Sequence, residues 1–136
     1  IDLVLPPDHP LAQHGSVDLR DLVDERWISV RGGFPVDDVL LSVAAATGVQ
    51  PRVMQRINDF RVTETLVAAG HGVALMPRYA VVHPDLVRRE LSGVRAGRIY
   101  ELATRPDARR LPAIAAVLDA FRAESEFKTV MWPPVP

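Results

Sequence analysis

The sequence predicts an α/β fold in which helices flank a mostly parallel sheet, and three features of the 136 residues lead to this prediction. Residues 66–77 read as the end of a helix, a tight turn at Gly70 and Gly72, and a short buried strand. Two other strands are predicted earlier in the chain, at 27–30 and 52–57. A helical pattern follows each of these two strands. The order strand, helix, strand, helix, strand is typical of parallel pairing with crossover helices.

The composition of the chain restricts the classes of function. The 17 acidic residues nearly cancel the 16 basic ones, so the chain lacks the basic excess that is typical of a DNA-binding domain. There is no cysteine, which excludes a disulfide scaffold and a thiolate metal site and fits a cytoplasmic protein. No apolar run approaches the roughly 18 to 20 residues that cross a bilayer, so we expect no membrane association.

The N-terminal elements are predicted as a strand at 1–5, a loop at 6–16 and a short helix at 18–22. The segment at 27–30 is rich in aromatic and β-branched residues, which favours a buried strand.

The helix at 36–47 is predicted by apolar residues that recur with helical spacing. Pro35 suits its first turn, and Asp37 and Asp38 suit the positive end of its dipole. Gly48 is expected to end this helix.

The second half of the chain continues the same alternation. Either Asn58 or Asp59 is a natural N-cap for a helix that runs to Ala69. The remaining predictions are strands at 73–76, 86–89 and 98–103, a helix at 111–126 and an irregular tail at 132–136.

Four segments also resemble a known family. They are LPPDHPLA at 5–12, the stretch from VDLRDL to ERWI at 17–28, LVAAGHGVALMP at 66–77, and RRLPA followed by VLDAFR within 109–122. In this order and spacing they are similar to the effector-binding domain of LysR-type transcriptional regulators. The resemblance covers most of the chain.

The resemblance implies a periplasmic-binding-protein-like fold with two subdomains and an effector cleft between them. Residues 24–90 would form the second subdomain, residues 1–23 and 91–127 part of the first, and residues 128–136 an irregular tail. The chain begins inside a predicted strand without an initiating Met. Compared with the family it lacks the DNA-binding helix-turn-helix, the linker helix and half of the first subdomain. We therefore interpret the chain as N-terminally truncated, with its first subdomain incomplete.

The resemblance also implies a function. The chain would sense a small metabolite, for which an anionic one is an option, and so modulate DNA binding and transcription by the full-length protein. DNA would be bound only through a helix-turn-helix domain absent from this chain. The family's effector domains pair side by side, so we expect a homodimer or homotetramer, with the helices at 36–47 and 111–126 as candidate surfaces. The alternative is a solute-binding module of a transport system, which shares the fold and would carry an export signal.

The predicted site lies beyond the carboxyl ends of the parallel strands, where such sheets bind ligands. The loops at 31–34 and 58–60 land there, and each leads into a helix whose first N–H groups attract anions. Gly32 and Gly33 allow close approach to the backbone, and Arg31 and Arg61 could add charge-assisted hydrogen bonds. With the resemblance, the predicted ligand-binding residues are Ser29, Arg31, Gly32, Gly33, Phe34, Asn58, Asp59, Phe60, Arg61, Met76 and Pro77.

A structural interpretation of the same loops stays open. Asp37, Asp38 and Asp59 already occupy the positive ends of the two helices. They would cap these helices and leave them little affinity for an external anion.

No residue pattern points to catalysis, to a metal or to a cofactor. The four histidines share no metal-ligand spacing, and Ser29 and Ser42 lack a neighbouring base. We therefore expect no enzymatic activity. The Arg-rich stretch at 88–110 is interpreted as solvated strand edges and loops rather than as a patch for DNA.

Overall fold

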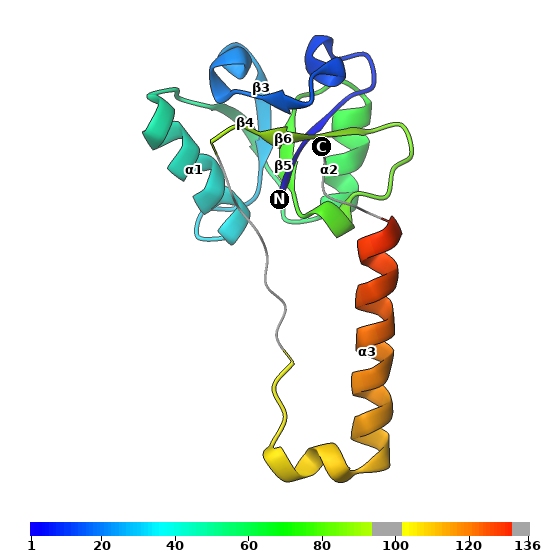
Figure 1. Cartoon of the computed structure of the whole chain (residues 1–136). Helices are drawn as coiled ribbons and strands as arrows, with labels where there is room; N and C mark the ends of the chain where they lie inside the picture. The colour runs from blue at the N-terminus through cyan, green and yellow to red at the C-terminus, as the bar shows by residue number, and fades with distance from the viewer. Residues whose placement is uncertain (94–101, 132–136) are drawn as a thin grey trace. The chain divides into compact units, whose positions relative to one another are not determined.

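The computed structural model describes residues 1–93 and 102–131, with residues 125–131 described by their backbone alone. The chain divides into two compact units, to which these two ranges belong respectively. The first unit holds the sheet and two of the helices, and the second holds the C-terminal helix (Figure 1).

Three parallel strands of the first unit were predicted from the sequence. β3 (Arg26–Ser29) lies between β4 (Arg52–Arg56) and β5 (Ala74–Met76). Its pairing with β4 runs along the strand, while its link to β5 is a short parallel bridge. In this bridge the N–H of Ile28 donates to the carbonyl of Val73 at 2.9 Å. The predicted order of strands and crossover helices is confirmed.

Gly72 permits the close approach of β5 to β3. A Cβ atom at this position would lie 2.4 Å from the carbonyl oxygen of Arg26, which is far inside van der Waals contact. The turn between α2 and β5 therefore requires glycine here for space.

Three further strands extend the sheet beyond β5. β1 (Asp2–Leu5) runs antiparallel between β5 and β6 (Val87–Leu91), and β2 (Ser16–Val17) pairs in parallel with β6 at the edge. The strands thus form a four-stranded sheet of order β2-β6-β1-β5 and a two-stranded sheet of β3 and β4, and the bridge between Trp27 and Val73 joins the two sheets. β2 was predicted as part of a loop, because a strand of two residues carries no readable periodicity.

The two longer helices of this unit pack on opposite faces of the sheet (Figure 1). α1 (Pro35–Thr47) packs with Leu40 and Val43 against a core that includes Leu3, Trp27 and Leu75. α2 (Phe60–Ala68) packs with Val67 against a second core that includes Val4, Ile28 and Met76. Residues 3 and 4 of β1 thus face opposite sides, as alternation along a strand requires. Burial on both faces explains why β1 is apolar after Asp2.

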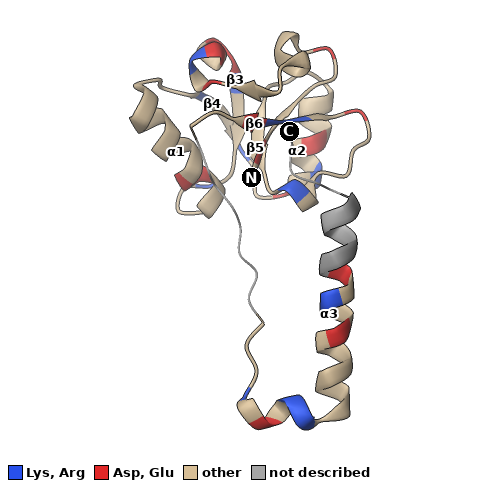
Figure 2. Ribbon diagram, in the orientation of Figure 1, with Lys and Arg blue, Asp and Glu red and all other residues tan. Residues whose placement is uncertain are grey.

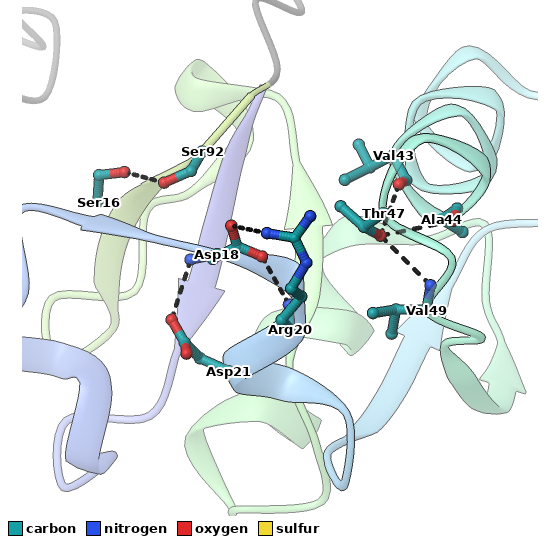
Figure 3. A network of polar contacts seen from close by, with 9 residues as sticks. All are labelled: Ser16, Asp18, Arg20, Asp21, Val43, Ala44, Thr47, Val49 and Ser92. Atoms are coloured by element: carbon teal, nitrogen blue, oxygen red, sulfur yellow. Dashed lines mark hydrogen bonds and ion pairs between the residues drawn. The ribbon is translucent and has the colours of Figure 1, made fainter.

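Local hydrogen bonds stabilise the start of η2 and the end of α1 (Figure 3). η2 (Leu19–Leu22) begins at a capping box, in which Asp18 accepts from the N–H of Arg20 at 2.8 Å and Asp21 accepts from the N–H of Asp18. At the C-terminus of α1, the hydroxyl of Thr47 donates to the carbonyl of Val43 at 2.8 Å. The predicted stop at Gly48 is confirmed, because this residue adopts a left-handed conformation with φ of 73°.

Two sequence predictions differ from the structure within its described part. Residues 1–23 were predicted to belong to a different subdomain from residues 24–90, but β1 and β2 are strands of the same sheet as β5 and β6. The physical reason is that β1 joins this sheet through antiparallel pairing across more than 70 residues, which leaves no local signal. The loop at 6–16 also contains a 3-10 helix, η1 (Pro10–Gln13), with His9 as its cap.

The predicted strand at 98–103 falls mainly outside the described residues, and residues 102–105 have no regular structure. The tail at 132–136 lies outside the described residues altogether.

The second unit consists of η4 (Pro106–Arg110) followed by α3 (Pro112–Met131). The helix predicted at 111–126 is confirmed and extends five residues further. Acidic and basic residues follow one another along α3, including an ion pair of 2.7 Å between Arg122 and Asp119 (Figure 2). Within the described residues, no helix is long and apolar enough to cross a membrane.

Candidate functional site

The carboxyl ends of β3, β4 and β5 lie at one edge of the first unit. From β3 the chain crosses through α1 to β4, its neighbour on one side. From β4 it returns through α2 to β5, which is the neighbour of β3 on its other side. The two connections therefore diverge at the end of β3, which is the place where open α/β sheets bind ligands.

The N-terminus of α1 presents free backbone donors at this edge. Phe34 is the N-cap residue, its side chain forms no capping hydrogen bond, and it is 47% exposed. Among the described residues, the N–H groups of Gly32, Gly33 and Val36 have no hydrogen-bond partner. Pro35 has no N–H to satisfy. The start of α1 thus combines an uncapped positive dipole end with an accessible loop.

A polar network lies directly behind this loop. The buried carboxylate of Asp37 accepts from the hydroxyl of Ser29 at 2.7 Å and from Nη1 of Arg56 at 2.7 Å. The same Nη1 donates to the carbonyl of Val30 at 2.8 Å. These bonds tie the first turn of α1 to the ends of β3 and β4. The hydroxyl of Ser29, a predicted ligand-binding residue, is therefore engaged inside the protein.

The N-terminus of α2 is arranged differently. Asp59 is its cap, and Oδ1 of this residue accepts from the N–H groups of Arg61 at 2.8 Å and Val62 at 3.3 Å. The cap predicted at 58 or 59 is thus Asp59. Asn58 has another role, because its Oδ1 accepts from the N–H of Arg31 at 2.8 Å and joins the two loops.

The predicted residues divide into two groups by exposure. Met76 and Pro77 are buried at the end of β5, and Phe60 is half-buried against both cores. The exposed members are Arg31, Gly32, Gly33, Phe34, Asn58, Asp59 and Arg61. The loop at 31–34 and the loop at 58–60 are brought together by the bond from Arg31 to Asn58, whereas Met76 is fully buried in the core that α2 covers.

Comparison with known proteins adds a family to this geometry. Residues 1–126 match the LysR substrate binding domain. The chain belongs to this family.

Two relatives are regulatory proteins by name. The small neutral protease regulatory protein of Streptomyces coelicolor is 33% identical over 122 residues, which cover 88% of this chain and 36% of that protein. The HTH-type transcriptional regulator CysL of Bacillus subtilis is 29% identical over 90 residues, which cover 66% of this chain and 30% of that protein. The chain thus spans about a third of the length of these relatives.

A solved structure supports the fold. The effector binding domain of QuiR in complex with shikimate matches 79% of this chain and 55% of its own with a TM-score of 0.64, at 20% identity. The periplasmic-binding-protein-like class that the sequence predicted is therefore confirmed for this LysR substrate-binding domain.

The sequence-based prediction did not include a charged cluster at the same edge of the LysR domain. Asp2 at the start of β1 is 1% exposed, and Arg78 binds its carboxylate in a fork, with Nε at 3.0 Å and Nη2 at 2.8 Å. This bond raises the pKa of Arg78 above its ordinary value, ahead of the opposing effect of burial. Nη1 of Arg88 lies 3.8 Å from the same carboxylate. The partners are 76 or more residues apart in the chain, so no local sequence motif indicates this cluster.

Free backbone N–H donors and guanidinium groups lie at this edge. No group of three or more metal-binding side chains occurs among the described residues. Of the histidines, His9 caps η1 with Nδ1 and has Nε2 at 3.2 Å from Glu25. Free N–H donors, guanidinium groups and a helix N-terminus together suit a small anion or a polar ligand.

Proposed function

We propose that this chain senses a small-molecule effector and so modulates DNA binding and transcription by the complete LysR-type regulator, as a cytoplasmic protein. The observation that carries this proposal is the uncapped N-terminus of α1 at the diverging carboxyl ends of the sheet, in a chain that belongs to the LysR substrate-binding family. A ligand that accepts hydrogen bonds from Gly32, Gly33 and Val36 would supply the acceptor that α1 lacks.

The effector would act by preferring one arrangement of the protein. A ligand shifts a conformational equilibrium only by the difference between its affinities for the two states. In the complete protein, DNA contact would be made by a helix-turn-helix domain outside this chain, and pairing of subunits into a homodimer or homotetramer would carry the change to it. Residues 1–93 would form one effector subdomain, and the second unit would belong to the other.

The shikimate complex of QuiR supports a carboxylate as the first ligand class to test on this chain. A carboxylate oxygen is a strong acceptor for backbone N–H groups at a helix start. The absence of a recognisable nucleophile and base in the sequence agrees with a sensing role without catalysis.

The test is a titration of the 136-residue chain with shikimate and other small carboxylates, followed by amide NMR. We expect saturable shifts at Gly32, Gly33 and Val36. Arg31→Ala should weaken binding about threefold to tenfold, because it removes an exposed charge beside the loop. The matched control is Arg52→Ala, which removes the same exposed charge from the opposite end of β4 and should leave affinity unchanged. Carboxylates that leave all three amides unmoved would contradict the proposal.

The rival function is a solute-binding module of a transport system. Sequencing of the DNA upstream of the first codon separates the two functions. A helix-turn-helix region there supports the regulator, whereas an export signal supports the transport module.

A further inference from the structure

We propose that Arg78 and Arg88 form an oxyanion-binding subsite, held in place by Asp2, that takes the carboxylate or phosphate group of the effector. This inference rests on the proposed function, because it adds two guanidinium donors to the backbone donors proposed for the same anionic ligand. The subsite lies where β5 ends and β1 begins, next to the diverging carboxyl ends of β3 and β5.

The charged cluster is short of hydrogen-bond acceptors. The carboxylate of Asp2 gives one oxygen to each of two N–H groups of Arg78, at 3.0 and 2.8 Å. Arg88 is left at 3.8 Å, which is too long for a hydrogen bond. Its Nη1 is buried and has no hydrogen-bond partner among the described residues. A buried donor of a charged group without an acceptor is costly, and an added oxyanion would supply one.

The charges in the buried part of the cluster do not balance. Two guanidinium groups converge on one buried carboxylate, so the buried part of the cluster carries an excess positive charge. Glu90 lies two residues beyond Arg88 on the same face of β6, but it is exposed and its charge is screened by water.

The side chains of Asp2, Arg78 and Arg88 meet on one face of the sheet and are partly accessible at the two arginines. Arg88 pairs across the strands with Val4, and Asp2 lies two residues before Val4, so both side chains belong to the face that α2 covers. Arg78 and Arg88 each expose 24% of their side chain. They are therefore held by the fold, and a ligand can reach the exposed part of each side chain, whereas Nη1 of Arg88 itself is buried. The fork of a guanidinium matches the two oxygens of a carboxylate or phosphate.

The experiment observes the side-chain Nε–H signals of Arg78 and Arg88 while inorganic phosphate or acetate is added to the 136-residue chain. The N-terminus is acetylated, so that the ammonium of Ile1 makes no contribution. We expect saturable shifts at both arginines, and the probe that shifts them at the lower concentration identifies the preferred oxyanion.

Arg88→Gln should raise the Kd about tenfold, because it removes a charge-assisted donor, and Arg88→Lys should restore part of the affinity. Arg88→Gln is expected to fold, since Nη1 makes no hydrogen bond in the free protein, and its amide spectrum far from the site verifies this. Arg52→Gln is the matched loss of charge and should change nothing. Absence of saturable shifts at Arg78, or equal Kd values for wild type and Arg88→Gln, would overturn the inference.

The two proposals fail in different ways. If shikimate moves Gly32 and Gly33 with the same affinity in the wild type and in Arg88→Gln, the effector site stands and the Arg78–Arg88 subsite is refuted. If phosphate moves Arg78 and Arg88 but no carboxylate moves Gly32 or Gly33, the subsite stands and the sensing role of the α1 loop is refuted.

Discussion

The N-termini of α1 and α2 lie after neighbouring parallel strands, yet they are completed in opposite ways. At α2, Asp59 accepts from two backbone N–H groups, as an N-cap residue normally does. At α1 the cap position is occupied by Phe34, whose side chain has no acceptor. One helix start is therefore satisfied by the chain itself, while the other keeps free donors.

This difference separates two interpretations that the sequence left open. Acidic residues near both helix starts suggested that both positive ends were already occupied. In the structure Asp59 does cap its helix, but Asp37 points its buried carboxylate at Ser29 and Arg56 instead. An acidic residue in the first turn can thus interact favourably with the helix dipole without accepting hydrogen bonds from the N–H groups of the preceding loop.

The largest effect is expected from Asp37→Ala. This change leaves the hydroxyl of Ser29 buried without its acceptor and frees Arg56, which is 44% exposed, from its partner. The free energy of unfolding should fall by about 3 kcal/mol. Urea unfolding monitored through the buried Trp27, with Trp132 replaced by Phe, measures the loss. Asp38→Ala, an exposed change in the same turn, should cost less than about 0.5 kcal/mol, and a similar loss from both variants would contradict the network.

Asp59→Ala removes the cap of α2. We expect a loss of about 1 kcal/mol, because two N–H groups lose their acceptor. The same urea experiment measures it. The comparison with α1 predicts that this variant also creates a second uncapped helix start, so new carboxylate-induced shifts at Arg61 and Val62 should appear. If the amides of Arg61 and Val62 stay unmoved, free donors alone are insufficient for binding.

Phe34→Asp makes the opposite change at α1. The backbone of Phe34 is already extended, with φ of −93° and ψ of 142°, so an aspartate can cap without rearrangement. Stability should rise by about 0.5 to 1 kcal/mol. Carboxylate affinity should fall at the same time, because the new side chain occupies the donors. Thermal unfolding and the NMR titration measure the two effects, and unchanged affinity in a stabilised variant would place the ligand elsewhere.

The smallest effect is expected from Asn58→Ala, which unties the two loops. One partly solvated hydrogen bond to Arg31 is lost, so the free energy of unfolding should fall by about 0.5 kcal/mol. Hydrogen exchange at the amide of Arg31 should become faster. Protection that is the same in wild type and variant would show that the loops are held together by other contacts.

Prediction from the sequence succeeded where the signal is local. The helix at 35–47 with its stop at Gly48, the cap at Asp59 and the parallel strands around Trp27 all follow from spacing and from residue conformational preferences. The loop at 31–34 and residues 58–59 of the second loop were located for the same reason, since a loop between strand and helix is defined by its two neighbours, whereas Phe60 is the first residue of α2.

Prediction failed where the partner is distant in the chain. Arg88 was interpreted as a solvated residue of an Arg-rich stretch, but it is largely buried beside Asp2. The assignment of residues 1–23 to another subdomain failed similarly, because an apolar strand such as β1 fits any sheet that buries both of its faces.

The local structure thus followed from the sequence alone. Periodicity distinguished helices from strands, glycine and proline residues marked their ends, and four matching segments indicated the family. Only tertiary structure decided that Asp37 faces inward, that the start of α1 keeps its donors, and that Asp2 joins two arginines more than 70 residues away. Local rules depend on neighbours in sequence, whereas burial and pairing of charges depend on which segments meet after folding.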